Sequence, residues 1–246
     1  MKYEKILKGN FLERPNRFIA RVVLDGQCDS DEAGLEVKAH VKNTGRCKEL
    51  LVPGAQVYLE DFTGRMGTRK MRYSLIGVEK VLPDGTKLMV NMDSQAPNKV
   101  VAEALADGSI KLPEMDKLRV IKGEKTYGES RFDFYVEDEE GRCGYAEVKG
   151  VTLEADGVVR FPDAPTQRGV KHINELVEVK RNGMEAFAIF IIQMEGMKEF
   201  RPNDDTHKAF GDALRSAAME GVHVLAYECR VGEDCLQVCR QIPVKL

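Results

Sequence analysis

The sequence lacks the features that assign a chain to a membrane, to secretion or to a zinc-binding fold. Among its 246 residues no apolar run is long enough to span a membrane, and residues 1–7 contain no apolar signal-peptide core. Five and three residues separate Cys229, Cys235 and Cys239, which is no common zinc-binding spacing. We therefore expect a cytoplasmic protein without membrane contact, whose six cysteines stay reduced.

A large excess of charge of one sign is also absent, because the formal net charge is −3. The distribution is less even: residues 1–90 carry a balance of +4 and residues 91–246 one of −7. Either of two cation-only runs could be a solvated loop, but two in one region favour a surface that faces a polyanion. The runs are Lys38, Lys42, Arg46 and Lys48, and then Arg65, Arg69, Lys70 and Arg72.

Residues 1–92 have the pattern of a small β-barrel. Stretches rich in β-branched and apolar residues are separated by turn sequences such as Asp25-Gly26 and Pro53-Gly54. This spacing predicts an OB-like five-stranded β-barrel, with an SH3-like barrel as the alternative. The expected strands are residues 17–24, 35–41, 56–61, 71–81 and 87–92.

Residues 93–246 alternate between helical and strand patterns, which predicts a mixed sheet flanked by helices. The whole chain is then an α/β (α+β) protein of two domains, residues 1–92 and 93–246. The expected helices are residues 99–106, 166–182 and 206–220, and the expected strands are residues 118–127, 131–137, 144–149, 186–193, 222–229 and 236–242.

Asp133, Glu147 and Lys149 predict a metal-dependent phosphodiesterase site. Side chains alternate along a strand, so Glu147 and Lys149 share one face while Val148 points into the core. A hairpin turning at residues 139–142 brings Asp133 beside them. Carboxylate oxygens suit Mg²⁺ or Mn²⁺, so we expect Asp133, Glu147 and the Val148 carbonyl as ligands.

Lys149 is then expected to orient and deprotonate the attacking water, or to stabilise the charge of the transition state. Glu124, one strand earlier, is a further candidate catalytic acid. A Glu-x-Lys pair on a strand is by itself usually a surface ion pair, so the prediction depends on Asp133 and Glu124 converging with it.

The stretch from Phe161 to His172 predicts phosphate contacts at the start of a helix. Thr166 can cap the helix, and Arg168, Lys171 and His172 lie in its first turns, where the backbone amides favour an anion. Arg168 and His172 are four residues apart and share a face. The alternative is that His172 only fastens the loop to the sheet.

The turn after residues 35–41 predicts a nucleic-acid contact in the first domain. His40, Asn43, Thr44 and Arg46 are expected at the binding rim of the barrel, together with Arg72, unless the turn is a plain hairpin loop. Aromatic residues are few here, and most are needed for the core. We therefore expect contacts to the phosphate backbone and little sequence preference.

Several sequence blocks in the same order resemble the sugar fermentation stimulation protein A (SfsA) family along nearly the whole chain. The blocks are Arg17–Val22, Ala39–Arg46, Glu49–Gly54, Ser130–Phe134, Glu147–Lys149, Phe161–His172 and Ile242–Leu246. The resemblance implies an OB-like domain joined to a domain with the fold of PD-(D/E)xK nucleases. It also implies sequence-nonspecific DNA binding and a part in regulating maltose and other sugar metabolism. Phe132 replaces the proline that names the nuclease motif, and Cys47 stands where a larger apolar residue is expected.

Three functions fit these residues. The first is a metal-dependent nuclease acting on DNA, or on RNA. The second is a DNA-binding regulator that keeps the nuclease fold without cutting, and the third is a metal-dependent hydrolase of another substrate. The acid–acid–lysine set favours the first, because a protein that only binds has no need of it. The oligomeric state is left open by the sequence.

Overall fold

The computed structural model describes residues 1–26, 34–43 and 45–246, which form two compact units. The first unit consists of Met1–Ala96, Gln193–Glu195 and Arg230–Leu236, and the second of Pro97–Ile192, Gly196–Cys229 and Gln237–Leu246. The chain therefore passes between the units several times, whereas the sequence places a single boundary after residue 92. Across the described residues no helix is long and apolar enough to cross a membrane.

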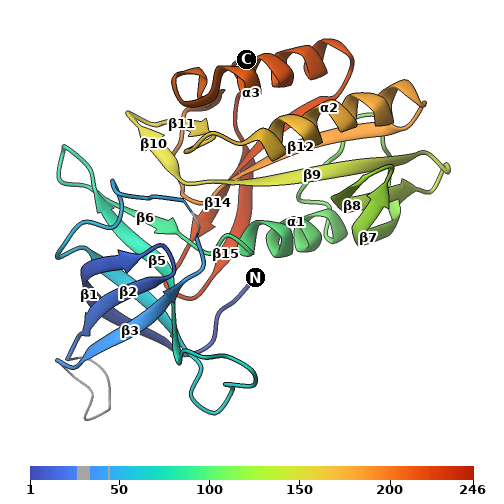
Figure 1. Ribbon diagram of the computed structural model, residues 1–246. Coiled ribbons are helices and arrows are strands. Elements are labelled where there is room, and N and C mark those ends of the chain that lie inside the picture. Colours follow the sequence, from blue (N-terminus) through green and yellow to red (C-terminus); the bar gives the residue numbers. More distant parts are fainter. Residues whose placement is uncertain (27–33, 44) are drawn as a thin grey trace. The chain divides into compact units, whose positions relative to one another are not determined.

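The first unit is an OB-type barrel of five strands with a sixth on its edge (Figure 1). Its strand order is β3-β2-β1-β4-β5-β6, and a parallel pairing of β3 with β5 closes the barrel. The strands are β1 (Ile6–Asn16), β2 (Ile19–Leu24), β3 (Glu36–Val41), β4 (Gln56–Asp61), β5 (Tyr73–Val81) and β6 (Lys87–Asn91).

The five expected strands correspond to β2 through β6, so the prediction missed β1 and counted β6 as part of the barrel. β1 has a weak strand signature because it contains Gly9 and Pro15 and its pairing with β2 is interrupted by two register shifts. The barrel closes through β1, which pairs with both β2 and β4.

The second unit is built on a six-stranded mixed sheet of order β15-β14-β12-β9-β8-β7. β9 pairs with β8 in antiparallel and with β12 in parallel orientation, and β12 pairs in parallel with β14. The strands are β7 (Leu118–Tyr127), β8 (Ser130–Asp138), β9 (Cys143–Val151), β12 (Glu185–Ile192), β14 (His223–Val231) and β15 (Leu236–Gln241). A small sheet of three strands that the sequence did not predict joins β10 (Leu153–Ala155), β11 (Val158–Phe161) and β13 (Glu199–Pro202).

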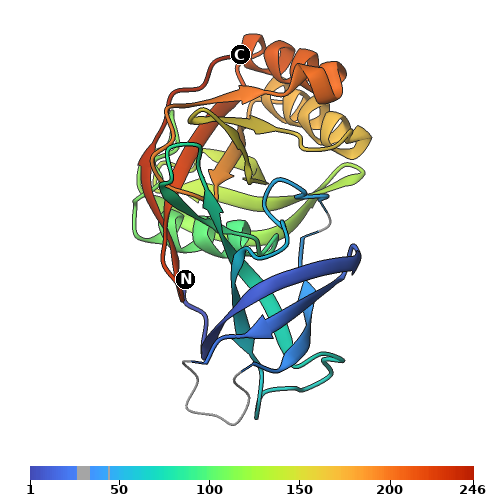
Figure 2. The ribbon, with the colours of Figure 1, turned by 90° about the vertical axis from the view of Figure 1, so that its left-hand side faces the viewer.

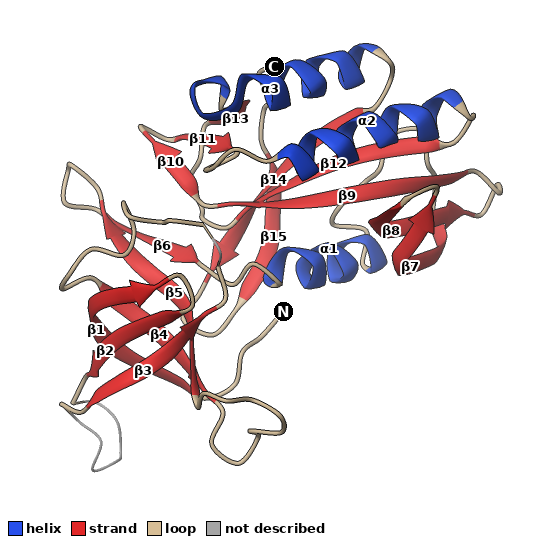
Figure 3. Ribbon diagram, viewed as in Figure 1, coloured by secondary structure: helices blue, strands red, loops and turns tan. Residues whose placement is uncertain are grey.

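Helices cover both faces of the six-stranded sheet. α2 (Gln167–Arg181) and α3 (Asp204–Met219) lie on one face and α1 (Ala96–Ala106) on the other (Figures 1 and 3). The turned view shows α2 and α3 side by side (Figure 2). β12 reads as a continuous apolar run because it is buried on both faces, and all of its residues after Glu185 are buried.

Candidate metal centre and nucleic-acid surface

The candidate metal centre begins where β8 and β9 separate. Their ladder ends at the pair Phe134 and Ala146, so the next amide of β9 on this edge, that of Val148, has no backbone partner on β8. The Val148 amide instead donates to Asp133 Oδ2 at 2.7 Å. Because N–H and C=O of one strand residue point to the same edge, the Val148 carbonyl also faces the side of Asp133.

Asn98 holds the other oxygen of the Asp133 carboxylate. Its side-chain nitrogen, on α1, donates to Asp133 Oδ1 at 2.7 Å. The sequence predicts a helix over residues 99–106, and α1 starts three residues earlier, at Ala96, so that Asn98 lies within it. No sequence signal linked Asn98 to Asp133, because the contact joins a helix to a strand 35 residues later.

Glu147 is buried, with 3% of its surface exposed. Two nitrogen donors contact its carboxylate. Lys149 Nζ and His172 Nδ1 both donate to its Oε1. Its Oε2 is shielded from solvent and has no hydrogen-bond partner among the described residues. A buried carboxylate oxygen without a donor is costly, which marks this atom as a position for a cation.

The two acids have opposite pKa shifts. Burial, and then the charge of Glu147, raises the pKa of Asp133 despite the hydrogen bonds from Val148 and Asn98. Burial alone would also raise the pKa of Glu147, but His172 and Lys149 outweigh it and lower that pKa. The pair therefore lacks positive charge on the Asp133 side, and a bound cation would supply it.

The donor set suits a cation that keeps part of its hydration shell. Within the described parts of the chain, no three His, Cys, Asp or Glu side chains form a metal-binding group by themselves. Two carboxylates with a backbone carbonyl, completed by waters and phosphate oxygens, are the usual protein contribution to Mg²⁺ sites. Asp133, Glu147 and the Val148 carbonyl thus fit Mg²⁺ or Mn²⁺.

Glu124, the further acid of the expected set, is on the strand beside Asp133 but has an exposed side chain. It lies on the edge strand β7 with a positive φ of 54°, and its side chain is 70% exposed and paired with Arg131 at 3.4 Å. Glu124 lies opposite Asp133, between the pairs that Gly123 and Lys125 make with β8. The Glu124 side chain is therefore exposed to solvent and paired with Arg131.

The start of α2 combines a confirmed cap with a corrected role for His172. Thr166 Oγ1 accepts from the Gly169 amide at 3.0 Å, as an N-cap should. Arg168 Nε donates to His172 Nε2 at 3.3 Å, so the neutral imidazole donates its Nδ1 proton to Glu147. His172 is buried and positions Glu147, so it is unavailable to a phosphate. Arg168 and Lys171 remain exposed, and Lys171 lies 3.6 Å from Glu129.

In the first unit, Arg14 organises the predicted rim. Its guanidinium donates to the carbonyls of Asn43, Gly45 and Arg46 at 2.7, 2.8 and 2.9 Å, and to that of Arg17 at 2.6 Å. The sequence did not predict this role. Asn43 Oδ1 accepts from the Gly45 amide, Arg46 is exposed, and Thr44 lies outside the described residues.

His40 and Arg72, the other two predicted rim residues, have different surroundings. Burial, and then the cations Arg69 and Lys42, lower the pKa of His40, which favours its neutral form. Arg72 gives its guanidinium to the buried carboxylate of Asp61 at 2.9 and 3.0 Å. Arg72 therefore stabilises the buried charge of Asp61, and its expected contact with phosphate stays a prediction.

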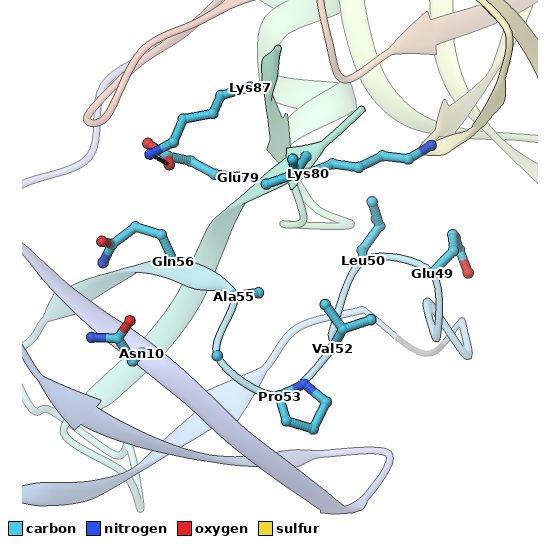
Figure 4. Close-up of a pocket in the computed structure, with 12 residues that line it drawn as sticks. Asn10, Glu49, Leu50, Val52, Pro53, Ala55, Gln56, Glu79, Lys80 and Lys87 are labelled. Atoms are coloured by element: carbon cyan, nitrogen blue, oxygen red, sulfur yellow. Dashed lines mark hydrogen bonds and ion pairs between the residues drawn. The ribbon is translucent and has the colours of Figure 1, made fainter. Parts of the chain in front are cut away.

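A cavity of about 580 Å³ opens in the first unit (Figure 4). Its apolar part includes Leu50, Val52 and Pro53. Two of its charged side chains, Glu79 and Lys87, pair with each other at 2.7 Å. None of the predicted metal or nucleic-acid residues lines it. The cavity is thus separate from both candidate sites.

Comparison with protein families gives two adjacent matches. The family described as "SfsA N-terminal OB domain" matches residues 12–88, and the "Sugar fermentation stimulation protein RE domain" matches residues 95–235. A sugar fermentation stimulation protein homolog of Desulfitobacterium hafniense (strain Y51) is 49% identical over 246 residues, which cover 100% of this chain and 99% of the relative. The homolog of Clostridium beijerinckii is 48% identical over 246 residues and 100% of both chains.

A solved structure has the same fold. "The structure of Pyrococcus Furiosus SfsA in complex with Ca2+" matches with a TM-score of 0.83 and 26% sequence identity, over 100% of this chain and 98% of that one. The agreement confirms the OB barrel and the mixed sheet with helices.

Proposed function

The chain belongs to the sugar fermentation stimulation protein (SfsA) family, and from that premise we propose that it is a divalent-metal-dependent phosphodiesterase acting on nucleic acid. The observation that carries the proposal is the buried Oε2 of Glu147, which has no hydrogen-bond partner in the described parts of the chain and lies next to a lysine, on the strand that Asp133 contacts. An ordinary surface ion pair does not contain a buried carboxylate of which one oxygen lacks a hydrogen-bond donor.

Asp133 and Glu147 would hold Mg²⁺ or Mn²⁺ together with the Val148 carbonyl. When bound, the ion would polarise the phosphate and lower the pKa of a water molecule. Asn98 and the Val148 amide fix the orientation of Asp133, and His172 fixes that of Glu147. Such outer contacts commonly decide how well a metal site is preorganised.

Lys149 would act on the attacking water. Its ammonium contacts Glu147 from the same face of β9, and its side chain is 20% exposed, so solvent and a substrate can reach it. As an ammonium, the lysine would orient the water and neutralise charge on the phosphate oxygens during attack. Arg168 and Lys171, exposed on the first turns of α2, would bind neighbouring phosphates.

The relatives support two parts of this proposal. The Pyrococcus furiosus SfsA structure is a complex with Ca²⁺, a cation that takes oxygen ligands as Mg²⁺ does. The name shared by the bacterial relatives connects the family with sugar fermentation, so we further propose that DNA binding by this protein influences sugar metabolism.

The test is cleavage of labelled single- and double-stranded DNA and of RNA, with Mg²⁺, with Mn²⁺ and with a chelator. We expect metal-dependent cleavage that Glu147→Gln and Lys149→Ala each reduce at least a hundredfold, because each removes a group that contacts the reacting atoms. Glu178→Gln changes an exposed acid on α2 that pairs with Arg181, and it is the matched control.

Two outcomes separate the alternatives. Salt-dependent DNA binding without cleavage under any metal condition would leave a regulator that keeps the nuclease fold. Metal binding without any affinity for DNA or RNA would point to a hydrolase of another substrate. Either result contradicts the nuclease proposal.

A further inference from the structure

Phe18 is the exposed aromatic side chain of the first unit. It is 45% exposed, whereas Tyr3, Phe11, Tyr58, Phe62 and Tyr73 are all at or below 9%. The sequence argued against base stacking because the barrel needs most of its aromatics for the core, and Phe18 is the exception. A single exposed apolar side chain is common on a protein surface, so the surroundings of the Phe18 ring decide what it can bind.

The Phe18 ring is held in a cationic environment. It occupies the two-residue turn between β1 and β2, and the Arg17 guanidinium lies 4.6 Å from the ring centroid. The Phe18 carbonyl accepts from the Val41 amide at 2.8 Å, which ties the turn to the end of β3. Within the part of the chain that the structure describes, no carboxylate pairs with Arg17 or Arg46.

Arg14 joins the two loops that carry these cations. Its guanidinium donates both to the Arg17 carbonyl and to carbonyls of residues 43, 45 and 46, so the turn with Phe18 and the turn with Arg46 are fixed to one another. His40 completes the surface: it pairs in register with Ile19, the residue after Phe18. Its lowered pKa keeps the imidazole neutral, able to donate and accept hydrogen bonds.

We propose that the Phe18 surface, formed by Phe18, Arg17, His40 and Arg46, binds single-stranded nucleic acid by stacking a base on the open face of the Phe18 ring. Aromatic rings beside cations that follow the phosphate backbone are the usual elements of single-strand binding by OB folds. Bases in a duplex already stack on their neighbours, so a ring at the tip of a turn selects an unpaired base. This inference rests on the proposed function and names the form of its substrate.

The chain contains no tryptophan, so Phe18→Trp introduces a single indole reporter at the proposed stacking position. We measure its fluorescence and the affinity for a labelled unstructured oligodeoxynucleotide and for its duplex, in chelator, so that no cleavage interferes. Val81→Trp is the matched control, because Val81 is 65% exposed and lies at the C-terminal end of the barrel strand β5, whose N-terminal end pairs with β3. We expect single strands to quench the indole at position 18 and leave that at position 81 unchanged.

Phe18→Ala should weaken single-strand binding about tenfold or more, with Phe18→Tyr restoring it and duplex binding unchanged. Arg46→Ala should lower the salt slope of single-strand binding by about 0.7. Equal affinity of Phe18→Ala and the unaltered protein for single strands would overturn the inference. So would a dimer that Phe18→Ala converts to monomer in light scattering, which would make this surface a contact between two copies.

The two proposals fail separately. Metal-dependent cleavage of duplex DNA with no single-strand binding at Phe18 would overturn only this inference. Absence of binding to every nucleic acid would overturn the proposed function as well.

Discussion

His172 illustrates what residue spacing can and cannot predict. The spacing of four residues correctly places Arg168 and His172 on one face of a helix, and they are in contact. Residue spacing cannot show which face of α2 is buried against β9. The buried face contains His172, and His172 therefore contacts Glu147. The pair Asp133 and Glu147 was easier to predict, because hairpin register follows from a short turn.

Replacing His172 tests its proposed positioning role. We expect His172→Ala to lower the affinity for Mn²⁺ by about 10- to 100-fold, because Glu147 loses a donor that fixes its orientation. Isothermal titration with Mn²⁺ measures the change. His223→Ala removes a histidine that pairs with Glu185 at 3.2 Å, and it should leave Mn²⁺ affinity unaltered. An unchanged affinity for His172→Ala would argue that lysine alone holds Glu147.

Asp61 is a buried carboxylate that we expect to make the barrel sensitive to acid. Burial would raise the pKa of its carboxyl, but hydrogen bonds from Arg72, Lys5 and Thr63 hold that pKa well below the usual range. Its contribution to stability is therefore complete above the unfolded pKa of about 3.9 and is lost as the pH falls towards the folded pKa.

We expect Asp61→Asn to reduce the free energy of unfolding by about 2 kcal/mol at pH 7. The difference from the unaltered protein should shrink by about 1.4 kcal/mol per pH unit below pH 3.9, because only the unaltered protein loses the carboxylate. Urea unfolding at pH 7, 4 and 3 measures both. A difference that stays constant over this range would show that the carboxylate charge is not the cause.

At the scale of elements, long segments with regular periodicity were predictable and short ones were not. β7 was expected with the bounds that it has, and α2 within one residue at each end, because period and caps agree along their length. β10, β11 and β13 have three or four residues each, too few to show a period. α3 begins at Asp204, two residues earlier than expected, and non-helical angles at His207 separate its short first turn from the main helix.

The cap of α2 gives a prediction for an element. Thr166→Ala should lower the free energy of unfolding by about 1 kcal/mol, because the Gly169 amide loses its partner. Thr68→Ala, at an exposed turn position, is the control and should be neutral. Thermal unfolding monitored by circular dichroism gives both values, and equal losses in the two variants would contradict the capping role.

At the scale of the whole molecule, the sequence predicts a single boundary between two domains, after residue 92. The first unit also contains two later segments, Gln193–Glu195 and Arg230–Leu236. The Tyr3 amide donates to the Asp234 carbonyl at 2.7 Å, and the Asn91 amide to that of Gln193 at 2.9 Å. Such contacts could not be predicted, because backbone pairing leaves no trace in residue type when the partners are about 100 or more positions apart.

A fragment of residues 1–96 should therefore be less stable than the same unit in the full chain. It lacks the partners of Tyr3 and Asn91, and the side chain of Asn91 also loses its contact with Gln193 at 2.8 Å. We expect fast amide exchange at these positions in the fragment and protection in the full chain, measured by hydrogen exchange. Equal protection in both would show that the fragment closes without the later segments.

The late arrival of residues 230–236 in the first unit has a consequence for biosynthesis. A ribosome delivers the barrel strands early, yet the segment of residues 230–236 that contacts Met1 and Tyr3 is translated only after strands β7 to β12. The N-terminal segment of the nascent barrel thus stays unpaired while strands β7 to β12 are synthesised, so completion of the barrel is coupled to synthesis of the second unit.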